Sequence, residues 1–359
     1  MKDMKINIYP EFFSNTEKTV FEADSFKVTA FKYSTGVCAL KLLNGESELI
    51  LLPFQGQQIW RARLGGRDLT MKNCYEEPVD TTDFITTYGG FLIHCGATAM
   101  GNPSPEDTHP QHGELPNMRY DYAYIKYGED EKGTYVAIGG YRDHLVAFTN
   151  HFEAEPEIKL YDGASTVDVT MKITNLRARA MEFIYLCHIN FRAMDGARLV
   201  WAGKTEQVYR DVPDFLSDEE KAELNAYVDK LEKDPSDHVV LDSKTQCFHP
   251  EVVFRVSNKA DETGYAHCMA VLPDETAYYV NYRTAELPVG VRWIARTGDE
   301  DALGMLLPST AEHLGMIHAR KTGQVERLAP GATKEMKMTF GLLDKDTAAK
   351  TEEKIKKMI

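Results

Sequence analysis

The chain has 359 residues, 43% hydrophobic and 10% aromatic, enough to bury one large β domain or two of ordinary size. Its 55 Asp and Glu outnumber 41 Lys and Arg, and the net charge of −14 argues against nucleic-acid binding. No apolar run approaches the ~18–20 residues of a membrane span, and no signal peptide is evident. The six cysteines have no CxxC spacing, which predicts reduced thiols. We expect a soluble, cytoplasmic protein with a small-molecule partner.

Short β-rich runs separated by turn residues follow one another along the chain. They include FKVTAFKY (26–33), SELILLPF (47–54), TVDVTMKITN (166–175), EFIYLCHINF (182–191) and KEMKMTFGLL (334–343). Many alternate polar and apolar residues, as strands with one buried face do. The runs recur about every 10–15 residues and long helical patterns are rare, which predicts an all-β fold built as a large antiparallel sandwich.

Three segments depart from this rhythm. Residues 216–234 have helical spacing with Ser217 as the N-cap and Glu220 three residues later, which predicts an inserted helix. The polar residues 345–359 predict a C-terminal helix. Between Tyr75 and Tyr120, Gly, Pro and His are frequent and strand signals are sparse, and loops of this length are usually functional. We expect residues 1–359 to form one continuous domain.

Two histidine segments carry the candidate chemistry. The first is THPQHGELPN (108–117), in which His112 and Glu114 stand in an irregular, proline-bounded loop. The second is YLCHINF (185–191), in which His188 interrupts an apolar strand and Asn190 points to the same side by the two-residue period. A histidine-rich loop and an inward strand histidine are components of a concave polar site. His109 is more typical of a loop or rim residue.

These segments resemble the aldose 1-epimerase family within the galactose mutarotase-like superfamily. HPQHGELPN is similar to the family's His-Gly motif, and YLCHINF to its second histidine segment. The resemblance continues in LPFQGQQIWRARLGGRDLT (52–70), YGGFLIHCGATAMGNP (88–103) and the closing GQVERLAPGATKEMKMTFGL (323–342). It covers roughly residues 20–343, and the divergent branch whose members mostly lack an assigned substrate is the most similar.

The resemblance implies a β-supersandwich with a monosaccharide or sugar derivative in its cleft. The implied reaction exchanges the α and β anomers, for which a proton leaves the anomeric hydroxyl and another reaches the ring oxygen. Histidine suits such transfers because its ordinary pKa lies near neutrality. His188 would be the acid at the ring oxygen, and His112 would help hold that oxygen. No cofactor is expected for this reaction.

The family's glutamate base is the one expected group that is missing. The matching passage is LGMLLPSTAEHLG (303–315), which has Leu307 before Pro308 where the family carries the glutamate. Leucine cannot accept a proton. Either Glu312 or Glu114 serves as the base, or the protein catalyses a different reaction. His94, Asn190, Arg283 and Trp293 are the candidate substrate-binding residues, because arginine forks and aromatic faces commonly bind sugars.

Two alternatives of other classes remain open. If His112, Glu114 and His188 converge, two imidazoles and a carboxylate could bind a divalent metal such as Zn, Mn or Fe. A metal would support sugar isomerisation, epimerisation or elimination in place of mutarotation. Alternatively, the leucine at the base position favours a carbohydrate-binding protein without catalysis. The identity of the sugar and the oligomeric state are not predicted.

Overall fold

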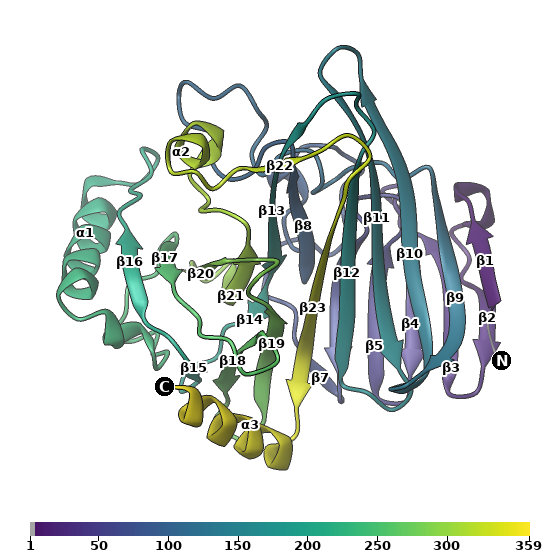
Figure 1. Ribbon diagram of the computed structural model, residues 1–359. Coiled ribbons are helices and arrows are strands. Elements are labelled where there is room, and N and C mark those ends of the chain that lie inside the picture. The colour runs from purple at the N-terminus through teal and green to yellow at the C-terminus, as the bar shows by residue number, and fades with distance from the viewer. Residues whose placement is uncertain (1–3) are drawn as a thin grey trace.

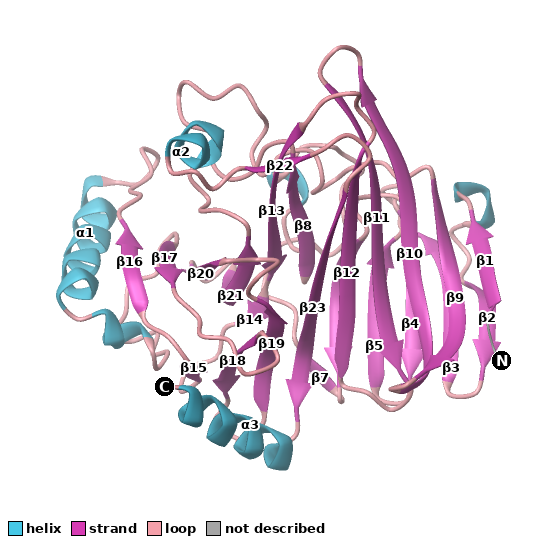
Figure 2. Ribbon diagram, viewed as in Figure 1, coloured by secondary structure: helices cyan, strands magenta, loops and turns pink. Residues whose placement is uncertain are grey.

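Two large antiparallel β-sheets form the protein in a computed structural model that describes residues 4–359 (Figure 1). One sheet has nine strands and the other has fourteen. In Figure 1 strands β9–β12 of the first sheet stand in front of β3–β5 of the second, and Figure 2 shows the helices at the periphery. The predicted all-β sandwich is confirmed. The prediction of one continuous domain stays a prediction, and its residues 1–3 lie outside the described residues.

The strand order within each sheet is as follows. The nine-stranded sheet runs β1 (Met4–Ile8), β9 (Tyr122–Asp130), β10 (Gly133–Val146), β11 (Asn150–Tyr161), β12 (Thr166–Asn175), β23 (Thr333–Leu343), β19 (Ala277–Arg283), β18 (Tyr265–Val271) and β15 (Arg198–Trp201). The fourteen-stranded sheet runs β16 (Thr205–Tyr209), β17 (Val252–Val256), β20 (Val289–Arg296), β21 (Asp301–Ser309), β13 (Met181–Ile189), β8 (Leu92–Ala97), β6 (Gln58–Leu64), β5 (Ser47–Leu52), β4 (Cys38–Asn44), β3 (Phe26–Lys32) and β2 (Lys18–Ala23). The short strands β7 (Arg67–Asp68), β14 (Phe191–Arg192) and β22 (Glu326–Leu328) pair with β6, β21 and β13 respectively.

Alternation in the sequence explains which faces are buried. In β12 every second side chain is buried, from Val167 to Ile173, because one face of this strand meets the core. Strand β13 differs, since all of its residues except Glu182 are buried and it is covered on both faces. A polar residue in such a strand needs a built partner or a ligand. His188 lies in this strand.

The described residues form three α-helices, which lie outside the sheets. Helix α1 (Asp218–Lys233) begins at the predicted cap, where the Glu220 N–H donates to Ser217 Oγ and the Glu220 carboxylate accepts the Ser217 N–H. Helix α3 (Lys345–Met358) confirms the predicted C-terminal helix. Helix α2 (Gly315–Lys321) and strand β8 were not expected, since each is short and lies among glycines. No described helix is long and apolar enough to cross a membrane, and all six cysteines are free thiols.

Candidate functional site

The His112–Gly113 pair is folded into a conformation that glycine alone adopts easily. His112 has φ +59° and Gly113 has φ +77°. The His112 N–H donates to Gly101 O at 3.0 Å, and its carbonyl accepts the Gly96 N–H at 2.8 Å. A Cβ on residue 113 would lie 1.9 Å from Ala99 O, so glycine is required there. These contacts hold the loop against β8 and set the direction of the His112 ring.

His188 is held in one tautomer by its neighbour Asn190. The Asn190 Nδ2 group donates to Gly90 O at 2.9 Å, which turns its Oδ1 toward the histidine. His188 Nδ1 therefore donates its hydrogen to Asn190 Oδ1, at 2.7 Å. Nε2 is then left as the proton acceptor of the ring. Asn190 was predicted to bind the sugar, but it is fully buried and does not line the cavity. Its contacts instead orient His188.

The two predicted histidines meet at one cavity. Their ring centroids are 5.7 Å apart, and His188 lies 5.2 Å from the Trp293 ring. Phe84 and Tyr88 pack on His112 and His188 respectively, so the rings form an aromatic enclosure. The cavity encloses about 250 Å³. An enclosure of rings with a few polar groups suits a single sugar, whose C–H faces pack on rings while its hydroxyls form hydrogen bonds.

Two further residues contribute polar groups to the cavity, and the first of them, Glu251, was missed from the sequence. Glu251 lines the cavity, and its Oε2 accepts the hydrogen of Trp293 Nε1. His313 also lines the cavity, edge-on to Tyr209, and within the described part of the chain neither of its ring nitrogens has a hydrogen-bond partner. Glu251 shares a face with Val253 by the two-residue period, so the strand EVVFRV carried a usable signal.

Burial controls the charge of the site. It lowers the pKa of His188 to about 4 against the opposing hydrogen bond to Asn190, and it lowers the pKa of His313 to about 4. Burial, with His188 and His313 nearby, holds the pKa of His112 well below 6.5. The expected titration near neutrality is therefore wrong for these rings. Burial also raises the pKa of Glu251, opposed by the Trp293 donor. The site holds neutral imidazoles and a carboxyl group that retains its proton more strongly than usual.

The two glutamates proposed as the base lie elsewhere. Glu114 accepts hydrogen bonds from the Thr98 backbone N–H, at 3.0 Å, and from the Thr98 hydroxyl. Its backbone N–H donates to Gly96 O at 3.0 Å, and Glu114 is not among the residues that line the cavity beside His112. Burial raises the pKa of Glu114 against those hydrogen bonds. The carboxylate of Glu114, which was one of the two predicted bases, is thus held by Thr98.

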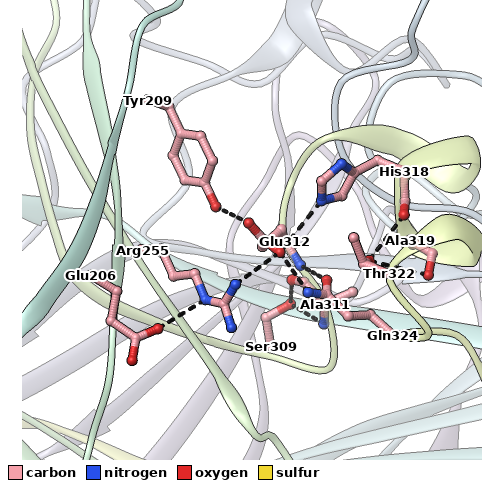
Figure 3. Close-up of polar contacts among 10 residues, drawn as sticks. All are labelled: Glu206, Tyr209, Arg255, Ser309, Ala311, Glu312, His318, Ala319, Thr322 and Gln324. Carbon is pink, nitrogen blue, oxygen red and sulfur yellow. Dashed lines mark hydrogen bonds and ion pairs between the residues drawn. The ribbon is translucent and has the colours of Figure 1, made fainter.

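Glu312 is enclosed by hydrogen-bond donors, as Figure 3 shows. Tyr209, Gln324, His318 and Arg255 all contact its carboxylate, with Arg255 Nη1 at 3.3 Å and His318 Nε2 at 3.4 Å. Burial raises the pKa of Glu312, but these hydrogen bonds outweigh it and the pKa falls below 4.5. The residue does not line the cavity. Its position fits a support for Tyr209, which packs against His313.

Two predicted substrate-binding residues, His94 and Arg283, do not line the cavity. His94 pairs with Cys187 across β8 and β13, so its side chain lies on the opposite face of the sheet from His188. There its Nδ1 is 2.7 Å from Tyr185 Oη. Arg283 ends β19 in the other sheet, where it is half-exposed and faces Glu286. Of the four predicted binding residues, Trp293 alone lines the cavity.

The predicted metal ligands do not assemble. His112 and His188 are close, but Glu114 is occupied by Thr98. Among residues 4–359, no three His, Cys, Asp or Glu side chains are grouped so as to hold a metal ion. These residues therefore do not fit the three-ligand site that the sequence suggested.

Comparison with known proteins places the chain in a family. The family model described as "Domain of unknown function (DUF4432)" matches residues 34–342. The chain belongs to the DUF4432 family. A search of curated proteins finds no match.

Solved structures share the fold of this DUF4432 protein. A Klebsiella pneumoniae protein, provisionally assigned as an aldose 1-epimerase, superposes with a TM-score of 0.79 at 18% identity, covering 99% of this chain and 91% of that one. A galactose mutarotase-like protein from Clostridium acetobutylicum gives 0.57 at 11% identity, covering 89% and 99%. One from Lactobacillus casei gives 0.52 at 13%, covering 85% and 99%. The DUF4432 chain therefore has the galactose mutarotase-like fold that its motifs predicted, in a divergent branch.

Proposed function

We propose that this protein interconverts the α and β anomers of a monosaccharide or sugar derivative, the reaction of an aldose 1-epimerase. The observation that carries the proposal is the arrangement around Trp293. His188, with its fixed tautomer, packs edge-on to the Trp293 ring, Glu251 accepts the indole N–H, and all three line one cavity of about 250 Å³. A proton acceptor and a proton donor thus both contact one aromatic ring in the same cavity.

The chemistry requires two proton transfers when the ring opens and their reversal when it closes, so the catalyst is unchanged at the end. His188 Nε2 removes the proton from the anomeric hydroxyl while Glu251 protonates the ring oxygen. The bond from C1 to the ring oxygen breaks, C1 becomes a carbonyl carbon, and the C1–C2 bond turns. On closure the ring hydroxyl attacks the other face of C1 and returns its proton to Glu251, and the new anomeric oxygen recovers its proton from His188.

In this mechanism His188 is the base, whereas the family resemblance implied that it is the acid. A ring with a pKa of about 4 is neutral at pH 7 and is a proton acceptor at Nε2, while burial favours the protonated form of Glu251. Glu251 also supplies the carboxyl group that Leu307 lacks. His112 adds a neutral hydrogen-bonding ring beside the reacting atoms, and Trp293 packs against a C–H face of the sugar.

Anomer exchange measured by NMR on a panel of aldoses and uronates tests the proposal. We expect wild-type protein to accelerate exchange for at least one sugar. His188→Ala and Glu251→Gln should each lower kcat by about 10²–10⁴-fold, the usual contribution of one acid or base. Glu182→Gln is the matched control, because this glutamate binds Arg320 at the surface, outside the cavity.

Three outcomes would contradict the proposal. If no sugar is accelerated although sugars bind, the protein is a carbohydrate-binding module. Full activity in Glu251→Gln would remove the assigned acid. Activity that is lost on chelation and restored by a divalent cation would favour a metal-dependent isomerase.

A further inference from the structure

The floor of the cavity is made of aliphatic side chains. Leu307 pairs with Val291 across β21 and β20, and Val253 pairs with Trp293 across β17 and β20. Leu186 precedes His188 by two residues on β13 and shares its face. All four aliphatic residues line the cavity and are at least 90% buried. We call Leu186, Val253, Val291 and Leu307 the aliphatic floor.

The charged groups at the cavity have one sign. Glu251 and Glu300 line it, and among the described residues that do so there is no lysine or arginine. Arg255, on the neighbouring strand β17, is bound to Glu206 and Glu312, as Figure 3 shows. A phosphate or carboxylate entering the cavity would lose water, meet carboxyl groups and find no cation.

We infer that the substrate is an uncharged sugar with a deoxygenated, methyl-bearing edge, such as a 6-deoxyhexose, and that Leu307 and Val291 select it. The inference rests on the proposed function and names its substrate class. The neutral imidazoles, Glu251 and Trp293 receive the anomeric side of the sugar. The aliphatic floor receives the edge without a hydroxyl.

The physical reason lies in the difference between a methyl and a hydroxymethyl group on this floor. A hydroxyl set against Leu307 and Val291 would give up its hydrogen bonds to water and find no replacement. A methyl group there gains from burial. Discrimination by about tenfold or more in kcat/KM is typical of such contacts.

Matched sugar pairs that differ only at C6 test the inference. These are D-fucose with D-galactose, L-fucose with L-galactose, and L-rhamnose with L-mannose. We expect the deoxy member of at least one pair to have a kcat/KM about tenfold higher or more. D-galacturonate and D-galactose 6-phosphate should react more slowly than D-galactose.

A substitution that keeps the shape of the side chain tests whether Val291 is responsible for the preference for the deoxy sugar. Val291→Thr offers a hydroxyl in the same volume, so the preference for the deoxy sugar should fall by about tenfold. Val289→Thr is the control, because Val289 lies two residues away on the same face of β20 and does not line the cavity. Thermal unfolding shows whether each variant keeps the wild-type fold.

The outcomes separate this inference from the proposed function. Turnover with equal kcat/KM for both members of every pair, or an unchanged preference in Val291→Thr, overturns the inference and leaves the function standing. If no sugar turns over, the function fails, and dissociation constants of the same pairs from calorimetry decide. Tighter binding of a deoxy sugar supports the inference, whereas equal affinity or no binding overturns it.

Discussion

The pKa of His188 is the result of two effects that act in opposite directions. Burial lowers it to about 4, and the hydrogen bond from Nδ1 to Asn190 acts in the other direction. Because the proposed base must be neutral, the rate should fall on the acid side only near pH 4, well below the 6.5 of an exposed histidine. On the alkaline side the rate should fall as Glu251 loses its proton, above the usual range of a glutamic acid. Anomer exchange corrected for the uncatalysed rate gives this profile, and an acid limb near pH 6.5 would contradict it.

The Asn190→Asp substitution should move the acid side of the pH–rate profile to higher pH. A carboxylate beside Nδ1 favours the charged imidazolium, so the acid limb should move upward by about one to three pH units. A variant that merely loosened the fold would lower the rate at every pH and leave the limb in place. The position of the limb therefore separates control of the His188 proton from a structural role.

At single residues, the sequence was informative where a local pattern determined the partner. His188 and Asn190 follow the strand period, and His112 precedes a glycine that must have positive φ. Glu251 was missed because its role depends on Trp293, 42 residues away. Glu114 was chosen for its proximity in sequence to His112, and Glu312 because it lies in the passage that matches the family's glutamate base. Their actual partners, Thr98 and Tyr209, lie 16 and 103 residues away and are invisible to local patterns.

The loop that carries His112 depends on one glycine. Gly113→Ala would place a Cβ 1.9 Å from Ala99 O and 2.8 Å from Gly96 O, in addition to the strain of φ +77°. Gly298→Ala is a matched control, since it has φ +90° and nothing within 4 Å of the added Cβ. Strain alone costs about 1–2 kcal/mol, so a larger loss in Gly113→Ala measures the clash with β8.

Urea unfolding gives both values. We expect Gly113→Ala to be the more destabilised of the two variants and to lose anomer exchange as the His112 ring shifts, while Gly298→Ala keeps wild-type exchange. Equal destabilisation would show that the loop can move away from β8.

At the level of elements, polar–apolar alternation and helix caps predicted strands and helix starts reliably. Strands that are buried on both faces could not be predicted in this way. Strand β12 and the Ser217–Glu220 capping box appear directly in the sequence. Strand β8 is fully buried, and its last two residues, Gly96 and Ala97, have φ +119° and +106°, so it has neither alternation nor a clean boundary. His94 was therefore wrongly predicted to face the cavity, because the sequence of a strand covered on both faces does not reveal which residues face which side.

Across the whole molecule, several histidines are buried in the neutral form. Burial lowers the pKa of His94 to about 3 and that of His238 to about 3, in addition to the values of about 4 for His188 and His313. In the unfolded chain these rings titrate near 6.5. Protons therefore bind the unfolded state first, and stability that is complete above pH 6.5 is lost as the pH falls toward 4.

This loss should be visible between pH 7 and pH 5. Each such ring costs about 2 kcal/mol at pH 5, at 1.36 kcal/mol per pH unit, which is large against the ~5–15 kcal/mol of a typical domain. The net charge of −14 becomes smaller over the same range, which by itself would stabilise the fold. A falling urea midpoint would therefore identify the histidines. His94→Gln should reduce the slope with pH, because it removes one of the rings whose pKa burial lowers. A midpoint that is constant from pH 7 to pH 5 would show that these rings are protonated equally in both states.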